Sequence, residues 1–291
     1  MNVAILGSSG YLGSAYLQVK APSGIRLVPA SRSLVNYHDP IILREFLRSE
    51  QIKGVINCAG FTGKPNVDAC EDFKELCFKL NVELPETIAK VCFDENMTLF
   101  QIGSGCIYQG TPDAGNPDKG YKEEDDPNFS FEHPPCSFYS GTKAEMEKRI
   151  KDIPGVSIFR LRMPFSSAKD DRNLLCKLSR YPKLIEASNS LSFLDEFISK
   201  SLKMVAAQIP SGIYNFTNPG VATNSQIVRL LIDKGIRSSE MAFFSSTSEA
   251  HSVMRAPRSA CILDSTKIAA LGFPLSDVHE SLILCMNKMI L

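Results

Sequence analysis

The feature that most constrains the fold is a set of spaced glycines directly after the first apolar segment of the chain. Residues 2–6 form a mainly apolar run that predicts a short buried strand, which leads into Gly7, Gly10 and Gly13 at G-x-x-G-x-x-G spacing. A glycine turn between a strand and a helix lets backbone N–H groups approach a pyrophosphate at the helix N-terminus. The pattern alone is weak, but its place straight after a strand favours dinucleotide binding over an ordinary turn.

Predicted strands and helices alternate along the first half of the chain. Asp39 and Pro40 indicate a helix start, because Asp caps helices and Pro suits the first helical position. The predicted strands are 2–6, 25–29, 54–57, 99–103 and 156–161, and the predicted helices are 11–19, 40–47, 78–94 and 137–151. This alternation predicts an α/β fold, a doubly wound parallel sheet of the Rossmann type.

The alternation breaks down after residue 163. We therefore expect an NADP-binding Rossmann domain over 1–163 and a smaller, mainly substrate-binding lobe over 164–291. Segments of the second part, such as 212–216, could return to the sheet. Residues 109–135 are rich in Pro, Gly, Asp and Asn and predict a long surface loop near the site.

Composition excludes several classes of function. The 32 basic and 32 acidic residues balance, whereas a nucleic-acid groove needs a basic surplus. No apolar run reaches the roughly 18 residues of a membrane span, and the first residues lack a signal-peptide pattern, so a cytoplasmic location is expected. The nine cysteines lack C-x-x-C spacing and the four histidines are scattered, so we expect reduced thiols and no metal site.

Three segments at predicted strand ends should meet in one cleft, because parallel sheets bind ligands beyond the carboxyl ends of their strands. They are the glycine loop, 57–60 and 104–106. The predicted cofactor-binding residues are Gly7, Ser9, Gly10, Tyr11, Leu12, Gly13, Ser31, Arg32, Asn57, Ala59, Gly60, Asn81, Tyr139 and Lys143.

The end of the second predicted strand bears on the choice of cofactor. NAD enzymes of this fold usually place an acidic residue there to hold the ribose diol. This chain has Ser31 and Arg32, and a hydroxyl beside a guanidinium suits a 2′-phosphate. The sequence therefore favours NADPH, with NADH and a merely surface-exposed Arg32 as the alternative.

A Y-x-x-x-K pair predicts catalysis of hydride transfer to a carbonyl. Tyr139 and Lys143 are four residues apart and share one face of a predicted helix. An adjacent ammonium and an oxidised nicotinamide should favour the phenolate, so that Tyr139 is a usable acid at neutral pH. Ser104 could hydrogen-bond the same substrate oxygen, and Asn81 could hold a water in a proton relay. The alternative is a solvated helix face.

Beyond these motifs, the chain resembles the extended short-chain dehydrogenases, and more closely the dTDP-4-dehydrorhamnose reductases. It resembles most the bifunctional 3,5-epimerase/4-reductases that make nucleotide-linked L-rhamnose in plants and giant viruses. The segments that carry the resemblance are 62–68, 105–108, 138–143, 162–164, 179–181, 215–220 and 256–259.

The resemblance implies a substrate and two chemistries in one pocket. The substrate would be a nucleotide-diphospho-4-dehydro-6-deoxy-D-glucose, with UDP favoured over dTDP. The 4-ketone acidifies the hydrogens at C3 and C5, and NADPH then reduces C4. The implied substrate-binding residues are Thr62, Asn66, Cys106, Tyr108, Met163, Lys177, Asn215 and Arg258.

The resemblance also assigns the epimerase pair to Cys106 and Lys177, without settling which is base and which is acid. A thiolate beside the positive cofactor should have a lowered pKa. The alternatives are a structural thiol for Cys106 and a phosphate contact or surface charge for Lys177. Arg258 is the candidate for the substrate diphosphate, the alternative being a salt bridge.

Two other functions stay open. One is a plain 4-keto-reductase without the epimerase step. The other is a non-catalytic NADP-binding regulatory subunit, against which the presence of Ser104, Tyr139 and Lys143 argues. Gln109 and Gly110 depart from the plant pattern, so the nucleobase is open as well. Many relatives pair into homodimers, which is the oligomeric state that the resemblance suggests.

Overall fold

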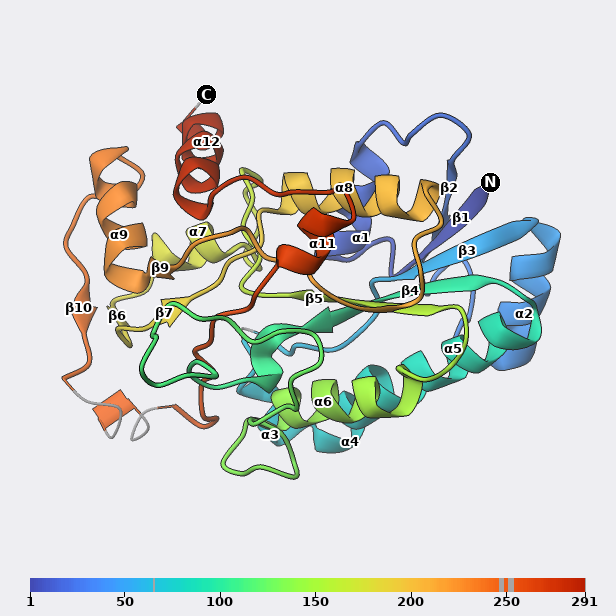
Figure 1. Ribbon diagram of the computed structural model, residues 1–291, viewed down its shortest axis with the longest axis horizontal. Coiled ribbons are helices and arrows are strands. Elements are labelled where there is room, and N and C mark those ends of the chain that lie inside the picture. Colours follow the sequence, from blue (N-terminus) through green and yellow to red (C-terminus); the bar gives the residue numbers. More distant parts are fainter. Residues whose placement is uncertain (65, 246–248, 251–253, 291) are drawn as a thin grey trace.

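The computed structural model describes residues 1–64, 66–245, 249–250 and 254–290 (Figure 1). Pro65, within one of the segments that carry the resemblance, and His251 lie outside the described residues. Six parallel strands form the central sheet in the order β2-β1-β3-β4-β5-β8. They are β1 (Asn2–Leu6), β2 (Arg26–Ala30), β3 (Ile52–Asn57), β4 (Thr98–Ser104), β5 (Val156–Leu161) and β8 (Gly212–Asn215).

This strand order confirms the predicted doubly wound sheet and places its switch point. The chain steps outward from β1 to β2, and then returns to the other side of β1 with β3. A crevice opens at such a reversal, outside the carboxyl ends of the two strands. The glycine loop leaves β1 and residues 57–60 leave β3, so both segments border the crevice.

Helices cover both faces of the sheet, each over its own apolar core (Figure 1). Helices α2 (Pro40–Ser49), α5 (Leu84–Asp94) and α6 (Phe138–Ile150) cover one face. Helices α1 (Tyr11–Gln18), α8 (Leu194–Ala206) and α11 (Thr266–Ala270) cover the other. Asp39 caps α2 as predicted, with its carboxylate accepting the N–H of Ile41 at 2.8 Å.

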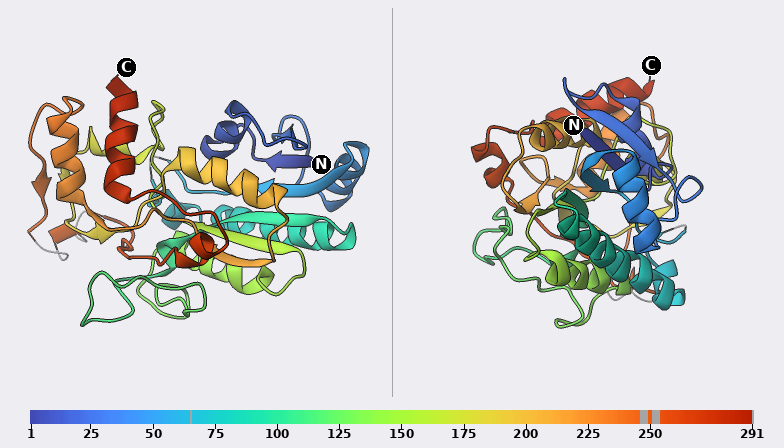
Figure 2. Two further views of the ribbon diagram at one scale, coloured as in Figure 1. Left: turned by 45° about the horizontal axis from the view of Figure 1, so that its top comes forward. Right: turned by 90° about the vertical axis from the view of Figure 1, so that its right-hand side faces the viewer.

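A second lobe with its own apolar core lies at one end of the sheet (Figure 2). Its elements are α7 (Leu174–Leu178), β6 (Lys183–Leu184), β7 (Ser188–Asn189), β9 (Ala222–Thr223), α9 (Asn224–Asp233), β10 (Ala242–Phe243) and α12 (Val278–Ile290). The second half of the chain is shared between the lobes, because α8, β8 and α11 belong to the sheet layers. A boundary at residue 163 therefore stays a prediction.

The helix predicted over 78–94 is divided by a wider turn. It consists of α4 (Lys74–Phe78), the π-helical turn η1 (Lys79–Glu83) and α5. The Leu84 N–H donates five residues back, to the Lys79 carbonyl. Pro85 follows and has no N–H to donate to the residue four positions before it, which is Asn81. The turn widens where that α-helical bond cannot form, and it carries Asn81.

Residues 109–135 are less superficial than the predicted surface loop. Tyr121, Glu123 and Phe129 are buried. Gly110 and Tyr121 form bridges with Cys261 and Leu263 of the C-terminal segment. The loop is buried because a segment far along the chain pairs with it, which its turn-rich composition does not reveal.

A buried ion pair ties α6 to the sheet. The guanidinium of Arg160 in β5 lies 2.8 Å from the Glu147 carboxylate, and both side chains are almost fully buried. Removing one partner leaves an uncompensated buried charge. We expect Glu147→Gln to lower the free energy of unfolding by about 3–5 kcal/mol, measured by urea denaturation.

Glu145→Gln is the matched control on the same helix, because Glu145 pairs with Arg149 in a partly exposed pair. It should cost less than about 1 kcal/mol. Equal, small losses for the two variants would contradict the stabilising role of the buried pair.

Candidate active site

The glycine loop lies against the segment that follows β3. Gly7 has φ +72°, and a Cβ at this position would lie 2.7 Å from the backbone nitrogen of Ala59. The Asn57 carboxamide braces the same segment, since its Oδ1 accepts the Ala59 N–H at 3.0 Å and its Nδ2 donates to Gln101. Two of the three predicted strand-end segments therefore meet, and only glycine fits at the contact.

The start of α1 offers unused backbone donors. Gly10 caps the helix without a side-chain hydrogen bond, so the first N–H groups of α1 are open to a ligand. A Cβ at Gly13 would lie 2.2 Å from the Gly7 carbonyl oxygen, which explains the close approach of helix and loop. An open helix N-terminus beside an exposed Ser9 suits a pyrophosphate.

Arg32 follows the end of β2 and is exposed. Its charge acts on the stacked rings of Tyr37 and His38, whose centroids are 5.3 Å apart. Among the residues that the structure describes, no carboxylate pairs with Arg32. Ser31 is buried, and its hydroxyl hydrogen-bonds that of Ser33 at 2.7 Å. An unpaired guanidinium at this strand end fits a 2′-phosphate.

Ser104, Cys106, Tyr139 and Lys143 are brought together at the carboxyl end of β4. Cys106 lies in the short 3-10 turn η2 (Gly105–Ile107), and its N–H donates to the Ser104 hydroxyl at 3.2 Å. The Lys143 ammonium is 6.0 Å from the centroid of the Tyr139 ring and donates to the Ile102 carbonyl at 3.1 Å. The predicted catalytic pair and the predicted epimerase thiol thus share one cluster.

In the free protein the pKa of Tyr139 favours the phenol over the phenolate. Burial raises this pKa well above its ordinary value, the nearby Cys106 raises it further, and the Ser104 hydroxyl opposes the rise. Burial also lowers the pKa of Lys143. Desolvation is the main cause of the raised pKa of Tyr139 in the free protein, because it penalises the phenolate in a buried site; the prediction also counted an oxidised nicotinamide, and for that bound state it stays a prediction. A protonated phenol at neutral pH is the form that donates a proton to an alkoxide.

The pKa of Cys106 is likewise raised, where a lowered value was predicted. Burial is the largest cause. Hydrogen bonds with Ser104 and Ser140 lower the pKa of the thiol, as do the charges of Arg162 and Lys143. Desolvation penalises the thiolate in a buried site; the lowered pKa was predicted for a thiol beside the positive cofactor, and for that bound state it stays a prediction.

Asn81 holds backbone in place. Its Oδ1 accepts the Phe61 N–H at 2.7 Å, and its Nδ2 donates to the Phe61 carbonyl and to the Thr142 hydroxyl. The wide turn η1 thereby joins the segment after β3 to α6, which carries Tyr139. Gly60 packs against the same amide, and a Cβ at this position would lie 3.1 Å from Oδ1. The predicted relay through Asn81 stays a prediction.

Two predicted substrate-binding residues are fully buried and engaged in the fold. The Tyr108 ring stacks on Tyr121 at 4.3 Å, and its hydroxyl donates to the Asp125 carbonyl. The Asn215 amide donates to the Tyr121 and Asp264 carbonyls. Both side chains therefore pack and brace the fold, and their polar groups are already engaged by the protein.

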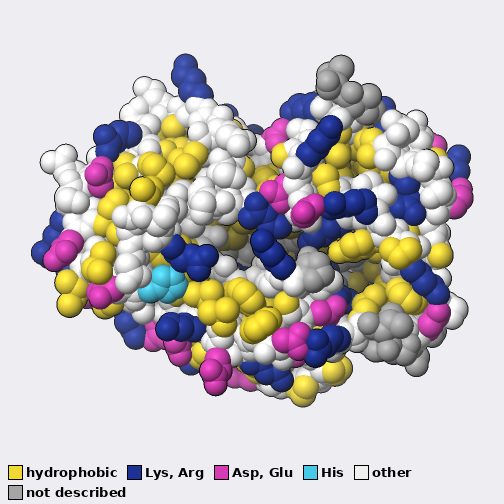
Figure 3. Space-filling view, turned by 180° about the vertical axis from the view of Figure 1, so that it is seen from behind, with side chains coloured by type: hydrophobic (Ala, Val, Ile, Leu, Met, Phe, Trp, Pro, Cys, Tyr) yellow, Lys and Arg dark blue, Asp and Glu magenta, His cyan; other side chains and the backbone are white. Residues whose placement is uncertain are grey.

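Lys177 lies apart from the catalytic cluster, on α7 of the second lobe. Burial lowers the pKa of this lysine, Asp170 opposes the shift, and the charges of Arg172, Arg180 and Arg258 add to it. Seen from behind, the molecule has a hollow near the middle of this face, with lysine and arginine side chains gathered around it (Figure 3). Basic side chains around a hollow suit a diphosphate.

Arg258 is held by an ion pair in the free protein. Its guanidinium lies 2.8 Å from the Asp68 carboxylate, and both side chains are about one quarter exposed. Asp68 also accepts the Ala256 N–H. The contact is the salt bridge that the sequence left as the alternative to a diphosphate contact.

The remaining predicted residues have separate surroundings. Tyr11, the first residue of α1, hydrogen-bonds Ser166 at 2.8 Å, and Leu12 packs against the core under α8. Met163 has φ +41° and packs on the core of the second lobe. Thr62 is exposed, and the Asn66 side chain accepts the Asp68 N–H.

Three neighbours of the predicted residues were missed at the level of sequence. Ser140 hydrogen-bonds Cys106, Asp68 pairs with Arg258, and Arg162 places its charge near Cys106. All three lie inside segments that carry the family resemblance. The available signals were the position of Ser140 next to Tyr139 and that of Arg162 directly after a buried strand, whereas Asp68 had no signal beyond its segment.

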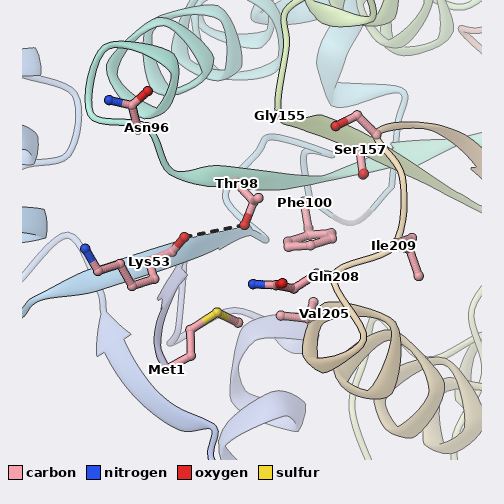
Figure 4. A pocket seen from close by; sticks show the side chains of 11 residues that line it. Met1, Lys53, Asn96, Thr98, Phe100, Gly155, Ser157, Val205, Gln208 and Ile209 are labelled. Carbon is pink, nitrogen blue, oxygen red and sulfur yellow. Dashed lines mark hydrogen bonds between the residues drawn. The ribbon is translucent and has the colours of Figure 1, made fainter.

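A cavity of about 380 Å³ lies at the amino ends of the sheet strands, opposite the candidate site (Figure 4). Lys53, Thr98 and Ser157 line it, and all are at the amino ends of their strands. The Thr98 hydroxyl donates to the Lys53 carbonyl at 3.5 Å. Because ligands of such sheets bind at the carboxyl ends, this cavity is separate from the candidate site.

Two other kinds of site have no counterpart in the described part of the chain. Over the described residues, no helix combines the length and apolarity needed to cross a bilayer. Nor do His, Cys, Asp and Glu side chains gather in threes around a possible metal position anywhere in those residues.

The chain is similar to a known protein family and to several curated proteins. The family model of the RmlD substrate binding domain matches residues 1–290. A bifunctional dTDP-4-dehydrorhamnose 3,5-epimerase/dTDP-4-dehydrorhamnose reductase of Arabidopsis thaliana is 35% identical over 286 residues, covering 97% of this chain and 91% of that protein. A trifunctional UDP-glucose 4,6-dehydratase/3,5-epimerase/reductase of the same plant is 34% identical, and the match spans 96% of this chain but only 41% of that protein.

Solved structures show the same fold. The L780 UDP-rhamnose synthase of Acanthamoeba polyphaga mimivirus superposes with a TM-score of 0.89 at 24% identity, covering 99% of both chains. A dTDP-4-dehydrorhamnose reductase of Bacillus anthracis, solved in complex with NADP, gives a TM-score of 0.83 at 18% identity, again over 99% of both chains.

Proposed function

Because the chain belongs to the RmlD substrate-binding domain family, we propose that it is an NADPH-dependent oxidoreductase of the 4-dehydrorhamnose reductase type that also epimerises its substrate. The substrate is a nucleotide-diphospho-4-dehydro-6-deoxy-D-glucose, UDP-linked in preference to dTDP-linked, and the product is the L-rhamnose nucleotide. The observation that carries the epimerase step is the position of Cys106, which shares a cluster with Ser104, Tyr139 and Lys143.

The keto sugar would react at three carbons in one pocket. The C4 ketone stabilises a carbanion at C3 or C5 as an enolate. Cys106 reaches the sugar from the sheet, whereas Lys177 belongs to the second lobe. Two lobes on either side of a ring allow a proton to leave one face and return to the other. After reduction at C4, the protonated phenol of Tyr139 neutralises the alkoxide, assisted by the Ser104 hydroxyl.

The residues of the glycine loop fit the nicotinamide cofactor. The uncapped start of α1 and the glycine contact with Ala59 form a cradle for a pyrophosphate. Arg32, unpaired within the described residues, would hold the 2′-phosphate. NADPH, when bound, supplies the hydride for C4.

Arg258 would exchange partners when substrate binds. In the free protein its guanidinium is satisfied by Asp68. A diphosphate can accept hydrogen bonds from the same planar guanidinium and carries more negative charge than one carboxylate does. The charge of Arg258 acts on Lys177, as do the charges of Arg172 and Arg180, and this gathering of cations around Lys177 favours a diphosphate at this place.

Product analysis tests the proposal. The purified protein is given NADPH with the UDP-linked or the dTDP-linked 4-keto-6-deoxy-glucose, and NMR identifies the sugar formed. We expect the L-rhamnose nucleotide, formed faster from the UDP-linked substrate. Reduction of only the already epimerised sugar would reduce the proposal to a plain 4-keto-reductase. Cofactor binding without any turnover would indicate a non-catalytic regulatory subunit.

Cofactor choice gives a separate prediction. Arg32→Ala removes the charged donor proposed for the 2′-phosphate, so NADPH affinity should fall about 10- to 100-fold while NADH affinity stays unchanged. Fluorescence titration with both cofactors measures the effect. Arg26→Ala is the control, because Arg26 begins the same strand at its other end and pairs with Glu50. An equal loss for NADPH and NADH in Arg32→Ala would refute the assignment.

The pH dependences of the two chemistries should diverge. Burial is the main cause of the raised pKa values of Cys106 and Tyr139. Deprotonation of the Cys106 thiol then needs a higher pH than deprotonation of an ordinary thiol. The rate of epimerisation should therefore still rise with pH above neutrality. Tyr139 stays protonated there, so reduction of the pre-epimerised sugar should not fall until higher pH. Initial rates measured from about pH 6 to 10 check this, and parallel profiles would contradict it.

A further inference from the structure

Arg162 is a buried cation without a carboxylate partner. It directly follows β5, which pairs with β4 so that Leu161 lies beside Ser104. The side chain is 7% exposed. Among the described residues no Asp or Glu forms an ion pair with it, in contrast to Arg160 two residues earlier. A buried charge is costly unless something of opposite sign compensates it.

The guanidinium is held in place on one side and open on another. One terminal nitrogen, Nη2, donates to the Asn189 Oδ1 and to the Ser259 carbonyl, both at 2.5 Å. The Nε is buried and has no hydrogen-bond partner in the described structure. Both acceptors are neutral, so the fixed group keeps a full positive charge and an unused donor.

Cys106 lies in the turn that Arg162 borders, because Leu161 pairs with Ser104 and the segment of Ser259 and Cys261, to which Arg162 donates, in turn donates to the Gly105 carbonyl. The charge of Arg162 lowers the pKa of the thiol of Cys106, and also that of Cys261, whose thiol donates to the Gly105 carbonyl. The titratable, charged and hydroxyl groups that act on or are acted on by the Cys106 thiol are Ser104, Ser140, Arg162, Lys143, Tyr139, Cys70, Cys136 and Cys261. Only Arg162 and Lys143 in this set are cations.

We propose that Arg162 is a positioning residue whose fixed charge stabilises the thiolate state of Cys106 during epimerisation. This inference rests on the proposed epimerase function. The thiolate takes a proton from carbon, and the C–H electron pair moves to the ketone oxygen as an enolate. The Lys177 ammonium returns a proton to the other face, and both groups then exchange protons with solvent. If Lys177 is the base and Cys106 the acid, the thiolate forms when Cys106 donates its proton. The positive charge of Arg162 then stabilises that thiolate in the same way.

Arg162 suits this role better than Lys143 does. The Lys143 ammonium already donates to the Ile102 carbonyl and lies beside the Tyr139 ring, where reduction occurs. Epimerisation precedes hydride transfer, so the reduced nicotinamide carries no positive charge at that stage. The charge that favours the thiolate then has to come from the protein, and Arg162 is the one that no other chemistry uses.

The test measures the Cys106 thiolate directly, without turnover. Iodoacetamide alkylation of the holoprotein with NADPH is followed against pH by mass spectrometry of the Cys106 peptide, which Cys106→Ser identifies. In Arg162→Gln the alkylation rate at neutral pH should fall about tenfold and its profile should move to higher pH. Arg162→Lys should stay within a few-fold of the wild type, because it keeps the charge. Unchanged profiles in Arg162→Gln would overturn the proposal.

A second variant separates charge from bracing. Asn189→Ala removes one acceptor that holds the guanidinium but leaves the charge in place. It should move the alkylation profile much less than Arg162→Gln does. Equal shifts in the two variants would mean that Arg162 only supports the local structure. If Arg162→Gln lowers the yield of folded protein, Arg162→Lys still tests the proposal, because a tenfold slower alkylation in a variant that keeps the charge would overturn it.

Deuterium uptake distinguishes failure of the inference from failure of the proposed function. The wild-type protein is incubated with the keto sugar in D₂O without NADPH, and incorporation at C3 and C5 is measured by NMR. No incorporation would refute the epimerase function, whatever alkylation shows. Incorporation together with an alkylation profile insensitive to Arg162 would refute the inference alone.

Discussion

Tyr139→Phe is expected to lower kcat for reduction of the 4-keto sugar by about 10²- to 10⁴-fold, the range for loss of a general acid. The substitution keeps the ring and removes only the hydroxyl, so the protein should remain folded. The hydroxyl is the group that interacts with Ser104 and whose raised pKa keeps it protonated at neutral pH. NADPH oxidation with the pre-epimerised sugar measures the effect and isolates reduction from epimerisation.

Tyr214→Phe is the matched control for this variant. Tyr214 lies in β8, and its hydroxyl donates to the Pro210 carbonyl away from the catalytic cluster. Its loss should leave kcat within about twofold of wild type, because no reacting group depends on it. Normal turnover in Tyr139→Phe would contradict the catalytic assignment altogether.

Cys106→Ser is expected to lose epimerisation by about 10²-fold or more while keeping reduction of the already epimerised sugar. Serine preserves the size and the neighbouring hydrogen bonds, but its hydroxyl is far less acidic than a thiol. NADPH binding should persist, since the glycine loop follows a different strand, β1. Deuterium incorporation at C3 and C5 and the rate of reduction are the two measurements.

Cys261→Ser controls for the loss of a buried thiol beside the same turn. Cys261 is 1% exposed and its thiol donates to the Gly105 carbonyl. Epimerisation should survive in this variant at close to the wild-type rate. If Cys106→Ser formed the L-rhamnose nucleotide at an unchanged rate, the Cys106 thiol would be structural.

The sheet could be predicted because its signals are local. Apolar runs between helical segments mark buried strands, and Asp39 with Pro40 marks a helix start that the structure confirms. The wide turn at Asn81 could not be predicted, since it depends on how the missing N–H of Pro85 is accommodated by packing. Nor could the burial of Glu123, whose carboxylate accepts the Asn215 N–H from a strand 92 residues away.

The candidate site divides in the same way. Motif spacing singled out Ser104, Tyr139 and Lys143, the family resemblance added Cys106, and the structure places the four residues in one cluster. The directions in which Tyr108 and Asn215 point were not accessible from the sequence, because each depends on partners distant in the chain.

The sequence by itself therefore determined the sheet, the glycine turn and the identity of the groups at the strand ends, because these follow from local spacing and backbone preference. Only the tertiary structure decided the charge states of those groups. Burial raises the pKa values of Tyr139 and Cys106, against the expectation from their neighbours. Desolvation depends on everything that is packed around a group. The same packing places Arg162 near Cys106, and among the described residues no carboxylate pairs with this arginine.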